Sequence, residues 1–137
     1  MASKDEIARF LAGEFPQMSV VLEAVGPGSA IVRREIGPAD LRPGGTVSGP
    51  VMMELADLAL YVALLGAIGI VPLAVTTNLN INFLRKPSAH KDLLAQCKLI
   101  KLGKTLAVGE VSIYSEGSTE AVAHVVGTYA IPAARSG

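Results

Sequence analysis

The sequence predicts an α+β fold in which one long apolar helix is wrapped by a curved antiparallel β-sheet. An uncharged apolar stretch over residues 58–75 has helical length. After it, residues 77–83 alternate between apolar and polar, as in a strand with one buried face, and before it Gly26-Pro27-Gly28 gives a hairpin signal. The connections between the later strands are short, which favours antiparallel hairpins.

Composition limits the classes of protein that the chain can represent. It has 137 residues, the length of one domain; 50% are hydrophobic and 18% are charged, which excludes a disordered chain and indicates that another subunit covers some surface. Twelve Lys and Arg balance twelve Asp and Glu, so the basic excess of nucleic-acid or anionic-lipid binders is absent. The single Cys97 cannot form an internal disulfide, and we expect a buried thiol and a cytoplasmic location.

The N-terminal third predicts a helix followed by a hairpin. Ser3 and Glu6 fit a capping box, and Pro16 ends the helix. No basic region precedes an apolar run here, which argues against a signal peptide. Two strands are expected next, over 18–25 and 29–36, and then an irregular loop rich in glycine and proline over 37–49.

The long helix is expected over residues 50–68. Ser48 is a suitable N-cap, and Pro50 is tolerated in the first turn. Nearly every face is apolar, which predicts a helix buried inside a sheet. Because Pro72 and the glycines before it shorten the continuous helical part, a membrane span is not expected.

Three polar residues interrupt this helix. Glu54, Asp57 and Tyr61 share one stripe, at i, i+3 and i+7. Burying two carboxylates one turn apart is costly, so two interpretations stay open. Either both acids face solvent near the helix start, or one is a general base or nucleophile placed after a glycine-rich turn whose N–H groups polarise a carbonyl.

Four strands are expected after the helix. Apolar residues alternate with three asparagines in the first, over 77–83, which predicts one buried and one polar face. The other three are expected over 92–102, 105–116 and 120–131. A lone strand histidine, His124, is interpreted as a packing or surface residue.

Four motifs follow one another along the chain: Gly44-Gly45-Thr46-Val47-Ser48-Gly49-Pro50, Leu55-Ala56-Asp57, Asn78-Leu79-Asn80-Ile81-Asn82-Phe83-Leu84-Arg85 and Gly127-Thr128-Tyr129-Ala130-Ile131-Pro132. In this order they resemble the hotdog-fold acyl-CoA thioesterases of the phenylacetate-pathway (PaaI-like) type. The resemblance covers nearly all of the chain after about residue 18. It implies one hotdog domain over 1–137, paired edge to edge in a homodimer and further in a dimer of dimers, a homotetramer.

The resemblance also implies an active site. Asp57, nine residues after Ser48, would be the general base or nucleophile, the Gly49 N–H would polarise the thioester carbonyl, and Thr76, with Thr77 as the near alternative, would orient water. Gly49 and Asp57 of one chain are expected to face Thr76 of the other. Further expected contacts are Ser48, Glu54, Tyr61 and Asn78 with the substrate, and Arg85, Lys86 and Lys104 with the coenzyme A phosphates.

The implied reaction is hydrolysis of an aryl- or medium-chain acyl-CoA to free acid and CoA, without a metal or redox cofactor. Three positions depart from the family pattern: Ser48 replaces a histidine, Pro50 a second glycine and Arg42 an asparagine. These departures favour the alternative, a non-catalytic acyl-CoA or lipid-binding hotdog protein. A dehydratase on the same fold would need a histidine at Ser48.

Overall fold

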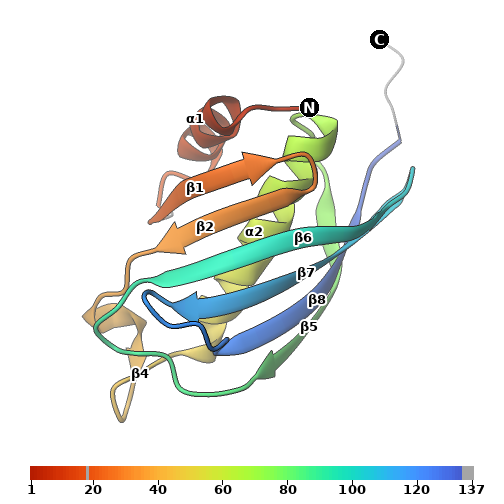
Figure 1. The fold of residues 1–137 in the computed structure, drawn as a ribbon. Helices are drawn as coiled ribbons and strands as arrows, with labels where there is room; N and C mark the ends of the chain where they lie inside the picture. Colours follow the sequence, from red (N-terminus) through yellow and green to blue (C-terminus); the bar gives the residue numbers. More distant parts are fainter. Residues whose placement is uncertain (18, 134–137) are drawn as a thin grey trace.

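Helix α2 (Gly49–Ile68) runs along the concave face of a curved six-stranded antiparallel sheet in this computed structural model, which describes residues 1–17 and 19–133 (Figure 1). The strand order is β1-β2-β6-β7-β8-β5. This arrangement confirms the predicted α+β fold with a central helix wrapped by a sheet.

All six expected strands are present. They are β1 (Val20–Gly26), β2 (Ser29–Arg34), β5 (Val75–Phe83), β6 (Leu93–Leu102), β7 (Leu106–Ser115) and β8 (Ala123–Ala130). Their ends shift from the predicted ends by no more than three residues, and the predicted start at residue 18 lies outside the described residues. The turn signals and the alternating pattern together therefore located the strands well.

Helix α2 begins at the predicted cap and is the core element. The Ser48 hydroxyl accepts a hydrogen bond from the Val51 N–H at 3.4 Å, and Gly69, with φ of 96°, ends the helix. By length and composition α2 could cross a membrane, yet 67% of its most apolar window is buried inside the domain. Such burial is expected of a core helix.

The sheet lies close to α2 because glycines face the helix. A Cβ atom added at Gly109 would lie 2.7 Å from Leu60 Cδ2, and one added at Gly127 would also collide with the Leu60 side chain. The Leu60 side chain therefore occupies the space beside two adjacent strands, β7 and β8. This close approach brings the middle of α2 within reach of side chains on β8 and β5.

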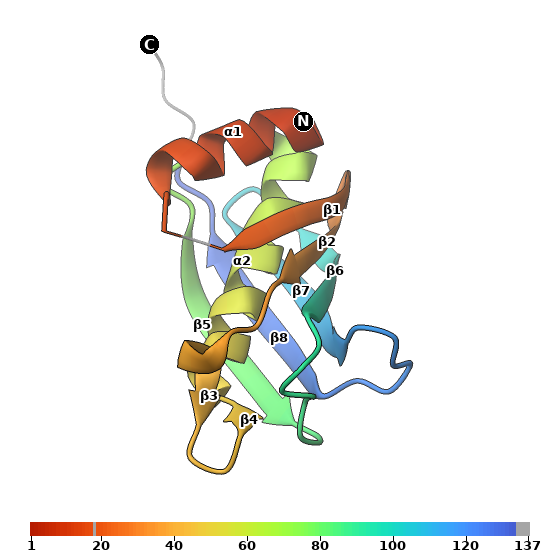
Figure 2. The same cartoon turned by 90° about the vertical axis from the view of Figure 1, so that its left-hand side faces the viewer.

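Helix α1 (Lys4–Glu14) packs across the C-terminal part of α2 (Figure 2). The predicted capping box of Ser3 and Glu6 is confirmed. Ile7 and Leu11 are buried, and the Phe10 ring lies 6.3 Å from the Tyr61 ring of α2. The helix ends at Phe15, whose N–H donates to the Leu11 carbonyl at 2.7 Å.

The segment over 37–49 is more ordered than predicted. It contains a 3-10 turn (Pro38–Asp40) and a small hairpin of β3 (Leu41–Arg42) and β4 (Thr46–Val47). Gly44 and Gly45 form its turn with φ of 100° and 78°, so the glycines interpreted as breaking regular structure instead permit the hairpin.

Strand β5 lies at an open edge of the sheet. Leu79 and Ile81 on its inner face are half-buried, but Phe83 is 51% exposed. The buried face predicted for this strand is therefore only partly covered within one chain.

Candidate active site

The polar stripe of α2 opens into a cavity of about 320 Å³. Its lining combines α2, the start of β5, the end of β8 and the end of α1, and it includes Glu54, Asp57, Tyr61, Thr76, Tyr129 and Phe15. Four residues predicted for the site, Glu54, Asp57, Tyr61 and Thr76, are thus brought together. Glu54 is exposed, one turn before Asp57.

Two hydroxyl groups hold one oxygen of the Asp57 carboxylate. Thr76 Oγ1 donates to Asp57 Oδ1 at 2.5 Å, and Tyr129 Oη lies 2.8 Å from the same oxygen and 3.0 Å from the Asp57 main-chain carbonyl. No residue in the described part of the chain donates to Oδ2. The carboxylate is therefore fixed through Oδ1, and Oδ2 is left for a reactant.

Tyr129 is a site residue that the sequence analysis missed. It is 5% exposed, and its ring stacks on Tyr61 with centroids 5.8 Å apart and planes 18° apart. Burial, with a contribution from the nearby Asp57 charge, raises the pKa of the Tyr129 phenol well above its ordinary value, so the group stays protonated and able to donate. The available signal was its inward position on the last strand, but its pairing with Thr76 could not be read from the sequence.

The structure corrects the expected partner of Thr76. An Asp57–Thr76 hydrogen bond forms within one chain, whereas Gly49 and Asp57 of one chain were expected to face Thr76 of the other. The reason is that β5 follows α2 closely and pairs with β8, so its first residues reach the stripe of the same helix. The near alternative, Thr77, donates to the Thr128 carbonyl at 3.3 Å instead.

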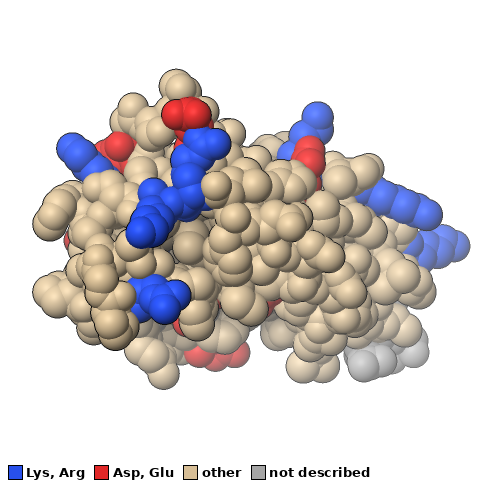
Figure 3. Space-filling model, turned by 90° about the horizontal axis from the view of Figure 1, so that it is seen from below, with Lys and Arg blue, Asp and Glu red and all other residues tan. Residues whose placement is uncertain are grey.

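The start of α2 borders a second cavity, of about 410 Å³, that is lined by Gly49 and by three cationic residues, Arg42, Arg85 and Lys86. Figure 3 shows Lys and Arg side chains gathered toward the end of the molecule that carries the β3–β4 hairpin, and a separate group at the opposite end. Arg85 pairs with Glu120 at 2.7 Å. The Ser48 hydroxyl is already engaged as the N-cap of α2.

Gly49 and Asp57 lie on the same helix but do not reach the same point. Eight residues separate them, which corresponds to about 12 Å along the helix axis. The N–H of Gly49 belongs to the first turn, where a helix leaves its donors without internal partners. One chain alone therefore does not bring this donor and the Asp57 carboxylate to the same small group.

Three predicted residues, Ser48, Asn78 and Lys104, line neither cavity. Asn78 pairs with Thr128 and points to the face of β5 opposite Leu79, whose side chain lies beside Gly127 on the helix side. Lys104 lies in the β6–β7 turn, at the Val75 end of the sheet, whereas Arg85 follows the Phe83 end, about 26 Å away along β5. Within one chain, Lys104 does not join Arg85 and Lys86.

Tyr61 contributes its ring rather than its hydroxyl to the site. Its Oη lies 3.3 Å from the carbonyls of both Val71 and Pro72, in the loop after α2. Burial raises the pKa of the Tyr61 phenol, so this group also stays protonated. Tyr61 thus forms an apolar wall beside Asp57.

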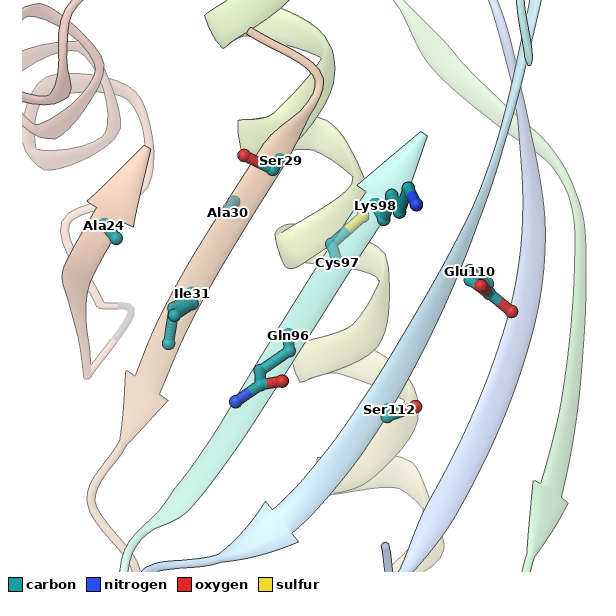
Figure 4. Close-up of a pocket in the computed structure, with 9 residues that line it drawn as sticks. All are labelled: Ala24, Ser29, Ala30, Ile31, Gln96, Cys97, Lys98, Glu110 and Ser112. Atoms are coloured by element: carbon teal, nitrogen blue, oxygen red, sulfur yellow. The ribbon is translucent and has the colours of Figure 1, made fainter. Parts of the chain in front are cut away.

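A further cavity, of about 410 Å³, lies on the face of the sheet away from α2 (Figure 4). Cys97 borders it but is 4% exposed, which confirms the predicted buried thiol, and burial raises the pKa of this thiol to about 12. His124, half-buried on β8, lies 3.1 Å from Glu110. Within residues 1–17 and 19–133, no three His, Cys, Asp or Glu side chains are placed to share a metal ion.

Comparisons with known proteins agree with this architecture. The family model described as Thioesterase superfamily matches residues 44–122. The structure of a putative thioesterase from Silicibacter sp. TM1040 is 44% identical, covers 95% of this chain and 92% of its own, and has a TM-score of 0.88. A comparison with curated proteins gives no match.

Two less similar structures share the fold. The E. coli PaaI protein from the phenylacetic acid degradation operon is 24% identical, with a TM-score of 0.73 and coverage of 93% of this chain and 88% of its own. The smu.793 protein from Streptococcus mutans UA159, bound to acetyl CoA, is 21% identical and has a TM-score of 0.77. The match covers 88% of this chain and 94% of the smu.793 protein. The fold is therefore the hotdog fold.

Proposed function

The chain belongs to the thioesterase superfamily, and from that premise we propose that it hydrolyses an aryl- or medium-chain acyl-CoA to a free acid and CoA, with Asp57 as general base or nucleophile. The observation that carries this proposal is the Asp57 carboxylate, held through one oxygen by Thr76 and Tyr129 at the wall of a cavity lined by aromatic rings. A fixed carboxylate with one free oxygen suits attack on a thioester.

As a general base, Asp57 Oδ2 accepts a proton from water. The Thr76 hydroxyl donates its hydrogen to Oδ1, so its oxygen can accept the second hydrogen of the same water. The water oxygen then bonds to the thioester carbon, the C–S bond breaks, and the proton passes to the leaving thiolate. As a nucleophile, Oδ2 would itself bond to the carbonyl carbon while the C–S bond breaks, and the CoA thiolate would leave and take a proton from water. Water would then hydrolyse the resulting anhydride to the free acid and the Asp57 carboxylate.

The carbonyl oxygen needs a donor that the Asp57 chain does not supply at that point. We assign this role to the Gly49 N–H of a second chain, because Gly49 lies about 12 Å along the helix from Asp57 of its own chain. Edge-to-edge pairing of β5 with a second β5 fits this role. The edge is open, and Val75, Phe83 and Leu84 along it are each more than half exposed. A homodimer, with a dimer of dimers above it, is the proposed assembly.

The cationic cavity beside Gly49 is the proposed site for the coenzyme A phosphates. Arg85 and Lys86 line it, and Arg42, in place of the family asparagine, adds a third cation. Because this cavity adjoins Gly49, the same chain would supply the cationic cavity and the N–H donor. Lys104 could reach the same coenzyme only from another chain. The reaction uses water and these groups, without a metal or redox cofactor, and we propose a cytoplasmic location.

A thiol-release assay with aryl- and fatty-acyl-CoAs tests the proposal. Asp57→Asn keeps an oxygen for the Thr76 and Tyr129 hydroxyls but removes the base, so we expect kcat to fall by about 10²–10⁴-fold. Glu110→Gln, an acid-to-amide change on the outer face of the sheet, is the matched control and should keep wild-type turnover. Absence of turnover in the wild type, with tight acyl-CoA binding retained, would instead support the binding-protein alternative.

A further inference from the structure

Phe15 separates two cavities. It lines the cavity that contains Asp57, and it also lines a groove of about 370 Å³ between α1 and β1. The first cavity has polar groups at Asp57 and Thr76 and becomes apolar toward Phe15, at Leu58, Tyr61 and Pro72. Among the described residues, Phe15 is the one residue that lines both the proposed acyl site and the second space, and it is 39% exposed.

Most side chains that line the groove beyond Phe15 are apolar. They include Leu11, Ala12, Val20, Val21 and Leu22, and Lys4 is the one charged side chain among the described residues that line it. Small alanine side chains on α1 and the branched side chains of β1 shape a channel suited to an alkyl chain rather than to a polar group. An acyl chain that entered the groove would thus meet apolar side chains from α1 and β1, beside the main-chain groups of the edge strand β1.

The Phe15 ring is held in place. Its backbone N–H donates to the Leu11 carbonyl at the end of α1, and its ring meets the Phe10 ring edge to face, with centroids 6.5 Å apart and planes at 82°. Phe10 contacts Tyr61, which stacks on Tyr129. A chain of four rings, which begins at Phe15 and passes through Phe10 and Tyr61, thus ends at Tyr129, the tyrosine that holds Asp57.

We propose that Phe15 is the end wall of the acyl pocket and sets the maximum length of the acyl group. This inference rests on the proposed function. The acyl group extends from the thioester at Asp57 past the Tyr61 ring and stops at Phe15. The natural substrate class is therefore a compact acyl group, an aryl or short-to-medium alkyl acid, and a long-chain acyl group is excluded by this one side chain.

The test is an acyl-length profile of Phe15→Ala, measured with saturated acyl-CoAs from acetyl to palmitoyl. In the wild type, kcat/KM should rise with length to a limit and then fall. In Phe15→Ala the two cavities join, and we expect the rise to continue for several more methylenes at roughly fourfold each, the effect of burying one CH₂. The double variant Phe15→Ala/Ala12→Leu refills the groove and should restore the wild-type limit.

Val21→Ala is the matched control, because it alters the groove and leaves the wall intact; its profile should equal that of the wild type. Titration calorimetry of the same acyl-CoAs gives a second readout that needs no turnover. If the wild type hydrolyses nothing, the proposed function fails, yet a Phe15→Ala shift in the length dependence of Kd still supports the wall. If Phe15→Ala leaves the acyl-length profile unchanged in both turnover and binding, Phe15 is not the end wall and the proposal is overturned. If Phe15→Ala does not fold, Phe15→Leu replaces it in the test, and it should increase the maximum acyl length by fewer methylenes.

Discussion

At the scale of single residues, the site depends on which oxygen of Asp57 is held. Thr76 and Tyr129 both bond to Oδ1, so the geometry distinguishes the two carboxylate oxygens and leaves Oδ2 for the proposed chemistry. Asp57 and Thr76 could be named from their position in a familiar pattern. Tyr129 could not, because its role depends on β8 lying beside β5 in a register that pairs it with Thr76.

Tyr129→Phe tests this role and leaves the ring stack on Tyr61 in place. A hydrogen bond to a charged group contributes about 1.5–3 kcal/mol, so we expect kcat to fall roughly 10- to 100-fold while KM changes little. Circular dichroism and the melting temperature serve as the folding control. A fall in KM as large as that in kcat would show that Tyr129 strains bound substrate rather than orienting the base.

Tyr129→Phe should also change how the free energy of unfolding depends on pH. Burial raises the Tyr129 pKa in the folded state, whereas the unfolded phenol ionises at about pH 10. Because only the unfolded state loses this proton just above that pH, this contribution to folding stability is complete below about pH 10 and declines above it. Urea unfolding at pH 9 and pH 11 should show a smaller decline for Tyr129→Phe than for the wild type.

The proposed role of Gly49 uses only its main-chain N–H group. Gly49→Pro deletes it at a helix position where proline is tolerated, and Gly49→Ala keeps it. An alanine Cβ would lie 3.2 Å from Phe83 Cζ, a contact that a half-exposed ring can relieve. Loss of one carbonyl donor lowers kcat by about 10²–10³, so we expect that loss for proline and a small effect for alanine. Equal losses would assign the effect to crowding of Phe83.

At the scale of elements, the loop that presents Gly49 depends on one ion pair. Arg34 Nη2 and Nη1 donate to the two oxygens of Asp40 at 2.9 and 3.0 Å, and the Gly37 N–H donates to Asp40 Oδ2 at 2.8 Å. The main-chain carbonyl of Asp40 in turn accepts the N–H of Ser48, the α2 cap, at 2.9 Å. This pair therefore connects β2 to the start of α2.

Asp40→Asn should lower the free energy of unfolding by about 1–3 kcal/mol, because it removes a charge and leaves Arg34, 14% exposed, without its carboxylate. The Arg34 hydrogen bonds hold the pKa of Asp40 below its usual value. Its stabilisation is thus present above about pH 4 and is lost as pH falls through the lower folded-state pKa. Denaturant melts from pH 7 to pH 3 should converge for the two proteins, whereas a constant gap would exclude this ion pair as the cause.

The elements themselves were predictable where a repeating pattern is long. Strands such as Leu106–Ser115 and the helix Gly49–Ile68 extend over enough residues for periodicity to identify them. The two-residue strands β3 and β4 are too short to carry a period, so the loop prediction missed them. The wall formed by Phe15 depends on how α1 docks against α2, and that contact leaves no mark in the local sequence.

At the scale of the whole molecule, the distance between Gly49 and Asp57 along α2 predicts that a complete site needs two chains. If each site takes Asp57 from one chain and Gly49 from its partner, two inactive variants can complement each other. One variant carries the substitution at Asp57 and the other at Gly49, and together they form one intact site. Asp57→Asn supplies an intact Gly49, and Gly49→Pro supplies an intact Asp57. A mixed dimer then contains one complete site and one that lacks both groups.

Co-expression of these two chains with different affinity tags tests the assembly directly. Random pairing makes half of the dimers mixed, so thiol-release activity should recover to about one quarter of the wild-type value per site, although each variant alone is nearly inactive. Dimers purified through both tags should reach about half. Size-exclusion chromatography with light scattering establishes that the doubly tagged material is dimeric or tetrameric. Inactive doubly tagged dimers would place the complete site within one chain, and the carbonyl would then need a donor other than Gly49.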